Sequence, residues 1–375
     1  MSKEKHIAFI LANYNGGGAE RVMITMANEL SQKGWRVDLI VGNTEGHLKD
    51  LVLQSVQVHD LGFQSVSRGF IKVIRYLRSH RPHILFSTLN HVNILATISA
   101  RLSMTGVKVV LREANTVSKV YQNMGKATQR DVKLSKWVYP FAHRFVAVSE
   151  GVKKDMVDFF NLKEHRIEKI YNPVVASSMV QMADAPTEHE WLDTADKPYK
   201  VILGVGRFTI PKNFVTLVRA LAHIREEMDV RLIIIGEQKL DKEEYQRVHS
   251  EVEKLGLQDV VSFPGFQSNP FAYFAKADVY VLSSIHEGLP GTLIQALAIG
   301  TSVVSTDCVV GVREILGNEE YGRIVPMKDP KKMAKAIVQQ LEQPTPTKAK
   351  RQARGMDFHV DQAIEKIDTF LTSLL

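Results

Sequence analysis

Apolar positions along the first 175 residues alternate between short β-rich runs and stretches with helical spacing. His6 to Leu11 reads as a buried strand, and Ala19 to Lys33 carries apolar side chains along one helix face, with Gly34 as its C-cap. Further strands are predicted at Trp35–Gly42, Val56–Leu61, His83–Ser87, Val107–Arg112 and Arg144–Val148, and helices at about Phe70–Ser79 and Val92–Leu102. Strands rich in Val and Ile without polar alternation predict a parallel sheet that is covered by helices on both faces.

The second half of the chain repeats this plan. It begins with the strand Lys200 to Gly206 and the helix Asn213 to Glu226, and strands and helices alternate from there. Asn172-Pro173 and the polar tract Met182 to Lys197 interrupt the periodicity, which marks a domain boundary. We therefore predict an α/β protein with Rossmann-like domains at 1–175 and 176–358, facing a central cleft, and a terminal helix at 359–375.

Composition limits the class of protein. A hydrophobic content of 45% and a charged content of 24% are typical of a soluble globular chain. The single cysteine, Cys308, excludes an intrachain disulfide and a cysteine-based metal cluster. The N-terminal apolar run is too short for a signal peptide, and no apolar run approaches the roughly 18 residues of a membrane span. We expect a cytoplasmic protein.

Positive charge is concentrated in the first half. Residues 1–175 hold 25 Lys and Arg against 14 Asp and Glu, whereas the remainder holds 23 against 27. Segment 118–141 contributes five cations to this excess and ends in Trp137, Tyr139 and Phe141. Such a helix suits an anionic membrane surface; no nucleic-acid motif accompanies the charges, so we expect no nucleic-acid partner. The alternative is a solvated helix that packs on its own domain.

Several polar residues and glycines follow strands of the first half. Gly16, Gly17 and Gly18 separate the first strand from its helix, at a spacing that fits neither the dinucleotide fingerprint nor a P-loop. His91 and the pair Arg112-Glu113 also follow strands, so we expect them at the same sheet edge as the glycines. For His91, a capping or surface role is the alternative.

The stretch Ser284 to Glu314 has the order strand, turn, helix, strand. It places Glu287 and the backbone amides of Gly291 and Thr292 at a helix N-terminus, which favours an anion. In the segment GVGRFTIPKNF, Arg207 follows a strand and Lys212 precedes a helix, so the two cations are placed to grip a diphosphate. The alternatives are an ordinary βαβ turn and solvated surface cations.

Three motifs together give the chain a family resemblance. GGGAERV, GRFTIPKNF, and EGLPGTLIQALAIGTSVVSTD followed by GVREIL occur in order and at the expected spacing. The chain thereby resembles the retaining glycosyltransferases of family 4, which have the GT-B fold. The resemblance implies a donor domain at the C-terminal side, an acceptor domain at the N-terminal side, and no cofactor or metal. It also implies that the last helix packs back on the N-terminal domain; packing within its own half is the alternative.

The resemblance assigns roles to individual residues. Arg207 and Lys212 bind the donor diphosphate, Glu287 hydrogen-bonds sugar hydroxyls, and the loop Gly288, Leu289, Pro290, Gly291 and Thr292 supports sugar and phosphates. Gly17 and Gly18 are further donor candidates, and Gly16, His91, Arg112 and Glu113 are acceptor candidates.

The second glutamate of the family's pattern is replaced by Gln295, which predicts weaker ribose binding. Glu237, after a strand, is expected near the base or ribose.

The predicted function is transfer of a hexose or N-acetylhexosamine from a nucleotide-sugar, most commonly a UDP-sugar in this family, to a polyprenyl-diphosphate-linked glycan. The setting is surface polysaccharide assembly at the inner face of the cytoplasmic membrane, with retention of anomeric configuration. Two alternatives stay open: a nucleotide-sugar epimerase of the same fold, and a non-enzymatic module that binds glycan or nucleic acid.

Overall fold

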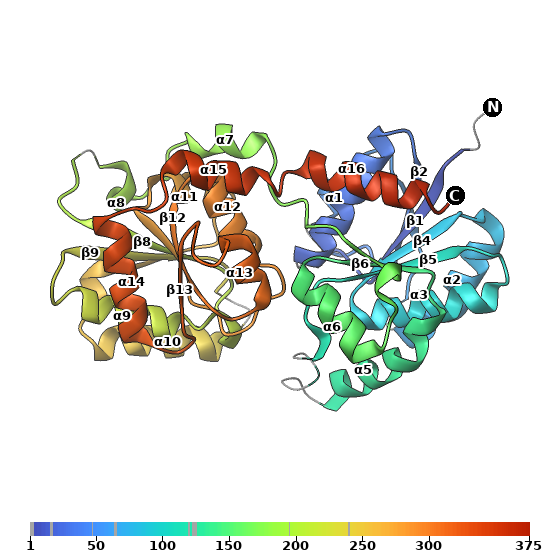
Figure 1. Ribbon diagram of the computed structural model, residues 1–375, viewed down its shortest axis with the longest axis horizontal. Helices are drawn as coiled ribbons and strands as arrows, with labels where there is room; N and C mark the ends of the chain where they lie inside the picture. Colours follow the sequence, from blue (N-terminus) through green and yellow to red (C-terminus); the bar gives the residue numbers. More distant parts are fainter. Residues whose placement is uncertain are drawn as a thin grey trace. The chain divides into compact units, whose positions relative to one another are not determined.

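The structure of the chain is a computed structural model that describes residues 4–15, 18–46, 48–63, 66–118, 121, 126–194, 196–238 and 241–375. The chain divides into two compact units (Figure 1). The first unit contains Met1–Pro173 and Val360–Leu375, and the second contains Val174–His359. The sequence had placed these boundaries at 175 and 359.

The first unit is built on a seven-stranded parallel sheet in the order β3-β2-β1-β4-β5-β6-β7. Its strands are β1 (His6–Leu11), β2 (Arg36–Val41), β3 (Gln57–Asp60), β4 (Ile84–Thr88), β5 (Lys108–Glu113), β6 (Arg144–Ala147) and β7 (Ile167–Lys169). Strands β1 and β4 are buried along their whole length, as expected for strands with both faces covered. The edge strand β3 is shorter than predicted and largely exposed.

Helices cover both faces of this sheet. They are α1 (Gly18–Gln32), α2 (Val66–His80), α3 (Asn90–Ser103), α5 (Lys126–Val138), α6 (Glu150–Phe160) and α16 (Val360–Thr372), with short 3-10 turns η1 (Lys49–Leu51), η2 (Tyr139–Phe141) and η3 (Glu164–Arg166). Ser149 caps α6 because its hydroxyl accepts a hydrogen bond from the Val152 amide at 3.1 Å.

The terminal helix α16 belongs to the first unit, where it lies beside α1 (Figure 1). Ile364, Ile367 and Leu371 form its buried stripe within the core of that unit. The indole nitrogen of Trp35 donates to Asp368 at 2.8 Å. The last residues of the chain therefore stabilise the N-terminal sheet.

The second unit has a six-stranded parallel sheet in the order β10-β9-β8-β11-β12-β13. Its strands are β8 (Lys200–Val205), β9 (Val230–Ile235), β10 (Val261–Gly265), β11 (Val279–Leu282), β12 (Ser302–Thr306) and β13 (Arg323–Val325). Its helices are α7 (Ser178–Ala183), α8 (Glu190–Asp193), α9 (Phe214–Ile224), α10 (Lys242–Lys254), α11 (Pro270–Lys276), α12 (Gly291–Ile299), α13 (Val310–Leu316), α14 (Pro330–Glu342) and α15 (Lys348–Met356), with 3-10 turns η4 (Ile210–Lys212) and η5 (Gln258–Val260). The predicted α/β class with two parallel sheets is confirmed.

The polar tract that interrupts the predicted periodicity lies inside the second unit. It contains the short helix α8, whose Trp191 and Leu192 are buried. Asp193 accepts hydrogen bonds from the amide and hydroxyl of Thr187, both at 3.0 Å. Local polar contacts of this kind order a segment without producing hydrophobic periodicity, so the pattern alone could not identify it.

Candidate active site

The loops after β8 and β9 leave the sheet in close contact. Gly236 has φ of +149°, and a Cβ placed on it would lie 1.8 Å from the Gly206 carbonyl oxygen. The Phe208 amide donates to the Glu237 carbonyl at 3.0 Å across the same junction. The sequence therefore needs glycine at 236, and the two loops present Arg207 and Glu237 at one carboxyl edge of the sheet.

Lys212 and Glu287 form an ion pair at this edge. The ammonium Nζ of Lys212 lies 2.7 Å from Glu287 Oε1, and the Ser284 hydroxyl donates to the same oxygen at 2.7 Å. Both charged side chains are mostly buried, with exposed fractions of 20% and 16%. An ammonium has three donors, so Lys212 keeps hydrogens for a second anion while it holds Glu287.

Backbone contacts fix the two loops that carry this pair. The Ile285 amide donates to the Pro211 carbonyl at 2.8 Å, and the Ser283 hydroxyl donates to the Lys212 carbonyl at 2.8 Å. Asn213, which is buried with φ of +51°, points its amide at the Ser283 carbonyl at 3.4 Å. Lys212 and Glu287 are consequently held by their main chains as well as by their charges.

Arg207 is exposed at the same edge, two residues after the end of β8. Among the described residues, its guanidinium has no hydrogen bond and no ion pair. A cation with unused donors beside an ion-paired lysine provides a site for a dianion. The binding of a diphosphate by Arg207 and Lys212 stays a prediction.

Helix α12 begins at Gly291, directly after the Gly288-Leu289-Pro290 turn. The amides of Gly291 and Thr292 have no carbonyl partner within the described part of the chain. The Thr292 hydroxyl instead shares a hydrogen bond of 2.7 Å with Tyr280 on β11. Two free amides and the positive end of a helix dipole stand next to Glu287, an arrangement that favours an anionic ligand.

Gln295 lies one turn further along α12 and is half-buried. Its side-chain amide donates to the Val174 carbonyl at 3.5 Å, at the start of the second unit. The glutamine therefore has a contact that a carboxylate could not make, because a carboxylate lacks a donor. Glu237 follows β9 and is also half-buried.

The predicted acceptor residues lie in the first unit. Gly16 and Gly17 fall outside the described residues, and Gly18 is the first residue of α1. His91 is in the first turn of α3 and is half-buried. Burial lowers the pKa of His91 below its ordinary value, an effect that Asp131 and Glu20 oppose, so the neutral imidazole is favoured.

Arg112 and Glu113 end β5 inside a buried polar network. Arg112 has no exposed surface; its guanidinium donates to Thr88 Oγ1 at 2.9 Å and to Asn172 Oδ1. The guanidinium therefore acts within the first unit and does not meet a ligand directly, contrary to the expectation from sequence. Burial lowers the pKa of Arg112 to about 10.

Glu113 accepts hydrogen bonds from Asn93 Nδ2 at 3.1 Å and from the Tyr139 hydroxyl. Burial raises its pKa to about 7, against the lowering effect of these hydrogen bonds and of Arg112. Beside it is a small cavity of about 60 Å³, lined by Leu89, Asn90, Glu113, Ala114, Asn115, Val117 and Val132. Leu89 has φ of +70°, which is rare for leucine. Glu113 is therefore buried, with this small cavity beside it.

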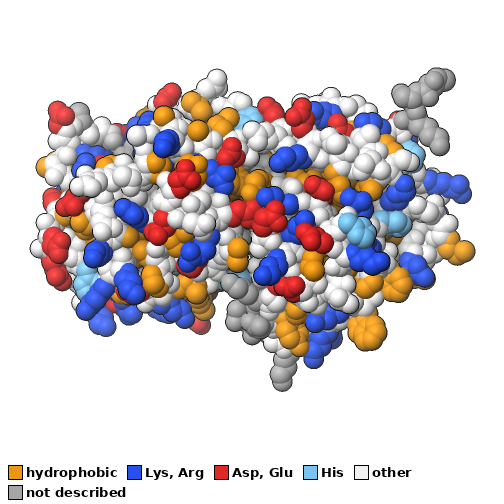
Figure 2. Space-filling model, in the orientation of Figure 1, with side chains coloured by type: hydrophobic (Ala, Val, Ile, Leu, Met, Phe, Trp, Pro, Cys, Tyr) orange, Lys and Arg blue, Asp and Glu red, His pale blue; other side chains and the backbone are white. Residues whose placement is uncertain are grey.

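Helix α5 and turn η2 carry exposed aromatic and basic side chains. Trp137 and Phe141 are 80% and 54% exposed, and Lys133 and Lys136 are exposed next to them. Figure 2 shows blue and orange side chains side by side over this part of the first unit. The prediction that Tyr139 belongs to this surface is wrong, because Tyr139 is fully buried and its hydroxyl donates to Glu113.

Two functional residues escaped the sequence reasoning. Ser284 orients Glu287, and Asn93 holds Glu113 and the Arg112 carbonyl. Neither belongs to a motif, and Asn93 lies on the buried face of α3 where an apolar residue is the usual choice. A polar residue within that apolar stripe was the available signal.

Neither unit contains, among the described residues, a cluster of three or more His, Cys, Asp or Glu side chains arranged to hold a metal ion. No helix in the described ranges has the length and apolar content needed to cross a membrane.

Comparison with known protein families gives two matches that together span most of the chain. Residues 16–177 match the model described as Glycosyltransferase Family 4, and residues 188–356 match the model of Glycosyl transferases group 1. The first match ends at residue 177, shortly after the start of the second unit at Val174, and the second match begins at residue 188.

Individual proteins show the same similarity. An N-acetylgalactosamine-N,N'-diacetylbacillosaminyl-diphospho-undecaprenol 4-alpha-N-acetylgalactosaminyltransferase from Campylobacter jejuni is 28% identical over 94% of this chain and 95% of its own length. The lipopolysaccharide core biosynthesis glycosyltransferase LpsE of Rhizobium meliloti is 26% identical over 86% of this chain and 85% of its own. The crystal structure of Anabaena HepE in complex with UDP and glucose superposes with a TM-score of 0.80 at 19% identity, over 98% of this chain and 99% of that one.

Proposed function

Because the chain belongs to the glycosyltransferases of group 1 and family 4, we propose that it transfers a hexose or N-acetylhexosamine from a UDP-sugar to a polyprenyl-diphosphate-linked glycan. The observation that carries the donor half of this proposal is the Lys212–Glu287 ion pair, which lies at the carboxyl edge that also presents the exposed Arg207. The site combines two cations for a diphosphate with one carboxylate for sugar hydroxyls.

In this proposal the second unit holds the donor. Arg207 and Lys212 bind the diphosphate, and the free amides at the start of α12 bind a phosphate oxygen or a sugar hydroxyl. Glu287, fixed by Ser284 and Lys212, accepts hydrogen bonds from sugar hydroxyls. Gln295 and Glu237 contact the ribose.

The proposed chemistry retains the anomeric configuration through a front-face displacement. The bond from the anomeric carbon to the diphosphate oxygen breaks, and the acceptor hydroxyl adds on the same face of an oxocarbenium-like centre while its proton passes to the departing diphosphate oxygen. Arg207 and Lys212 counter the negative charge that develops on the leaving oxygen, which selectively stabilises the transition state. No protein nucleophile, metal or cofactor takes part in this scheme.

For the acceptor, we propose a glycan on a polyprenyl diphosphate, bound by the first unit. The similar Campylobacter protein is named for a diphospho-undecaprenol substrate, and the first 175 residues of this chain carry an excess of 11 positive charges. In this assignment the cavity beside Glu113 receives part of the acceptor sugar. His91 follows the lining residue Asn90 in α3, and the buried Arg112, next to Glu113 in the chain, is a positioning residue.

A lipid-linked acceptor requires contact with a membrane, and we propose that the first unit rests on the anionic inner face of the cytoplasmic membrane. Of the predicted segment 118–141, residues 119, 120 and 122–125 lie outside the described residues; α5 and η2 supply part of this surface, and the neighbouring end of α3 extends it. Met104 is 87% exposed there, and the Arg101 guanidinium lies 4.6 Å from the Phe141 ring centre. Apolar side chains interleaved with cations describe an interfacial surface.

The donor site is tested by the Arg207→Ala, Lys212→Ala double variant. UDP release and glycan extension are measured with UDP-hexoses and UDP-N-acetylhexosamines, using undecaprenyl-diphosphate-linked glycans as acceptors. Loss of transition-state stabilisation predicts a fall in kcat of at least about 10²-fold. The control is Arg219→Ala, which removes an exposed cation paired with Glu251 on the outer face of the same unit. Undiminished turnover in the double variant would disprove the site.

A further inference from the structure

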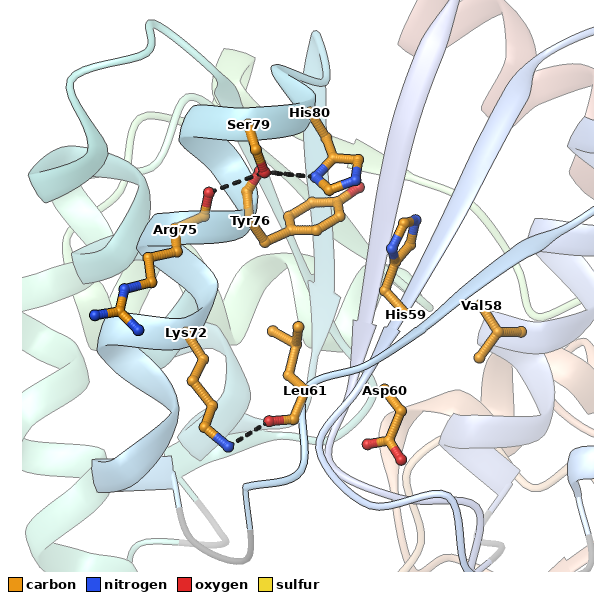
Figure 3. Close-up of a pocket in the computed structure, with 9 residues that line it drawn as sticks. All are labelled: Val58, His59, Asp60, Leu61, Lys72, Arg75, Tyr76, Ser79 and His80. Carbon is orange, nitrogen blue, oxygen red and sulfur yellow. Dashed lines mark hydrogen bonds between the residues drawn. The ribbon is translucent and has the colours of Figure 1, made fainter.

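A second candidate site, with a positively charged lining, lies in the first unit between the edge strand β3 and helix α2 (Figure 3). It is an open groove of about 640 Å³. The groove is lined by Val58, His59, Asp60, Leu61, Lys72, Arg75, Tyr76, Ser79 and His80. None of these residues takes part in the donor or acceptor site described above.

The rim of the groove carries a positive charge that the protein does not neutralise. The Arg75 side chain is exposed, and its guanidinium has no hydrogen bond or ion pair among the described residues. Lys72 donates to the Leu61 and Gly62 carbonyls at 2.6 and 2.9 Å, which positions its ammonium over the end of β3 (Figure 3). These carbonyls are neutral partners, so the charge of Lys72 stays available.

The single acid on the rim is already engaged. Asp60 accepts hydrogen bonds from the Gly62 amide at 2.8 Å and from the Thr44 hydroxyl at 3.3 Å. Its carboxylate therefore stabilises the turn after β3 and is not paired with Lys72 or Arg75. The lining has a net positive charge even with both histidines neutral.

A buried carboxylate fixes the floor of the groove from behind. Asp38 has no exposed surface and accepts a hydrogen bond from the Tyr76 hydroxyl. Nε2 of His59 lies 3.4 Å from the same Asp38 oxygen, and Nε2 of His6 lies 3.0 Å from it. The Tyr76 and His59 rings are thus anchored on their inner side.

His80 completes the floor. Its ring stacks on Tyr76 with 4.4 Å between ring centres and meets the edge of His59 at 4.7 Å. Its Nδ1 lies 2.8 Å from the Ser79 hydroxyl, which leaves Nε2 as the ring nitrogen for a ligand. The His59 and His80 imidazoles therefore line the same groove as Lys72 and Arg75 (Figure 3).

We propose that this β3–α2 groove binds a phosphate group. Arg75 supplies a bidentate fork, Lys72 a fixed point charge and His80 Nε2 a further ring nitrogen for phosphate oxygens. The Ser79 hydroxyl is already engaged, since it donates to carbonyls of its own helix. The volume exceeds that of a phosphate alone, so the ligand carries a further group over the Tyr76 and Leu61 surface. The phosphate belongs either to a soluble phosphoryl compound or to a lipid headgroup.

The proposal is tested by imidazole NMR of protein labelled with ¹³C-histidine, because the donor site would also bind phosphates and a bulk titration would not separate the two. His59→Gln and His80→Gln spectra assign the two resonances. Inorganic pyrophosphate is then titrated at fixed pH and constant ionic strength, and phosphatidylglycerol and phosphatidylcholine vesicles are titrated separately. Saturable shifts of both resonances are expected with at least one phosphate source.

Arg75→Gln is the decisive variant, because its side chain has no partner in the described structure whose loss would disturb the fold. Arg68→Gln removes the same charge from the exposed side of α2 outside the groove. Apparent affinity should fall by about tenfold or more in Arg75→Gln and remain within about twofold in Arg68→Gln.

Shifts with pyrophosphate assign the site to soluble phosphates. Shifts with phosphatidylglycerol alone assign it to a lipid headgroup. Absence of saturable shifts with either source, or equal effects of the two variants, would overturn the proposal. Either outcome leaves the glycosyl transfer measurement unaffected.

Discussion

Lys212 Nζ and Glu287 Oε1 lie 2.7 Å apart although the two residues are separated by 75 positions in the chain. The pair joins the loop after β8 to the loop after β11, and Ser284 holds the same carboxylate oxygen. Since each charge is mostly buried, removal of one leaves the other without its counter-ion. The pair therefore has both a structural role and, in the proposed reaction, a role in binding the donor.

Substitution of Glu287 separates these roles from each other. In Glu287→Gln the amide can still accept from Ser284, but the charge that holds Lys212 is lost. We expect turnover to fall by about 10²-fold, while the free energy of unfolding decreases by no more than about 2 kcal/mol. Steady-state kinetics and thermal denaturation measure the two effects.

Ser284→Ala provides the comparison for that variant, since it removes only one hydrogen bond to the carboxylate. A smaller loss of about tenfold in kcat is expected from it. If Glu287→Gln retained full kcat and only lost stability, the carboxylate would be structural and the sugar contact would have to be abandoned.

Gln295 is the position where this chain departs from its family's second glutamate. In Gln295→Glu the donor to the Val174 carbonyl disappears, whereas a carboxylate that can accept two ribose hydroxyls is gained. We expect tighter donor binding, by about three- to tenfold, together with a loss of stability below about 1 kcal/mol because the existing hydrogen bond is long. Calorimetric titration with UDP-sugar and a melting curve measure these quantities.

The matched control is Gln295→Ala, which removes the Val174 contact without adding a carboxylate. It should share the small loss of stability but not the gain in affinity. Donor affinity that is unaltered in Gln295→Glu would mean that the ribose is bound elsewhere.

The sequence was sufficient to predict the alternation of strands and helices, because buried parallel strands such as β1 and β4 have no polar alternation. It was also sufficient to mark Arg207, Lys212 and Glu287, which follow strands in motifs. The hydrogen bond from Ser284 to Glu287 could not be predicted from the sequence, since nothing in the local pattern distinguishes that serine from any turn residue. The prediction of an exposed Tyr139 was wrong for a related reason. Tyr139 lies between the exposed Trp137 and Phe141 in the sequence, and the turn η2 directs its side chain inward to Glu113.

The raised pKa of Glu113 makes stability depend on pH in a defined direction. Its value of about 7, against an ordinary 4.5, means that the folded chain holds the proton more tightly than the unfolded chain. This stabilising contribution is complete below pH 4.5 and is lost as the pH rises through 7. Over that interval the free energy of unfolding should fall by up to about 3 kcal/mol from this group.

Glu113→Gln removes the titration. The difference in urea midpoint between wild type and variant should therefore shift in favour of the variant as the pH is raised from 4.5 to 8. Glu168→Gln, at an exposed position on β7, should leave the pH dependence of the wild type unchanged. Parallel pH profiles for wild type and Glu113→Gln would assign the titration to another group.

The proposed membrane surface leads to a prediction about binding. Among the described residues of the first unit, Met104 and Trp137 are the most exposed large apolar side chains, and they lie at the end of α3 and the end of α5. Burial of these two side chains in the interfacial region would contribute about 3 kcal/mol at most, so a Met104→Ser, Trp137→Ser double variant should bind vesicles about 10- to 100-fold more weakly. Co-sedimentation with phosphatidylglycerol vesicles measures this, with phosphatidylcholine vesicles as the uncharged reference. Phe266→Ser, which removes a 70% exposed aromatic from the second unit, should not change the binding.

Because the cations Arg101, Lys133 and Lys136 remain, the double variant should keep a weak, salt-sensitive attraction to the anionic vesicles. Equal vesicle binding by wild type and double variant would place the membrane contact on another surface, and turnover on a water-soluble acceptor analogue should be the same for both.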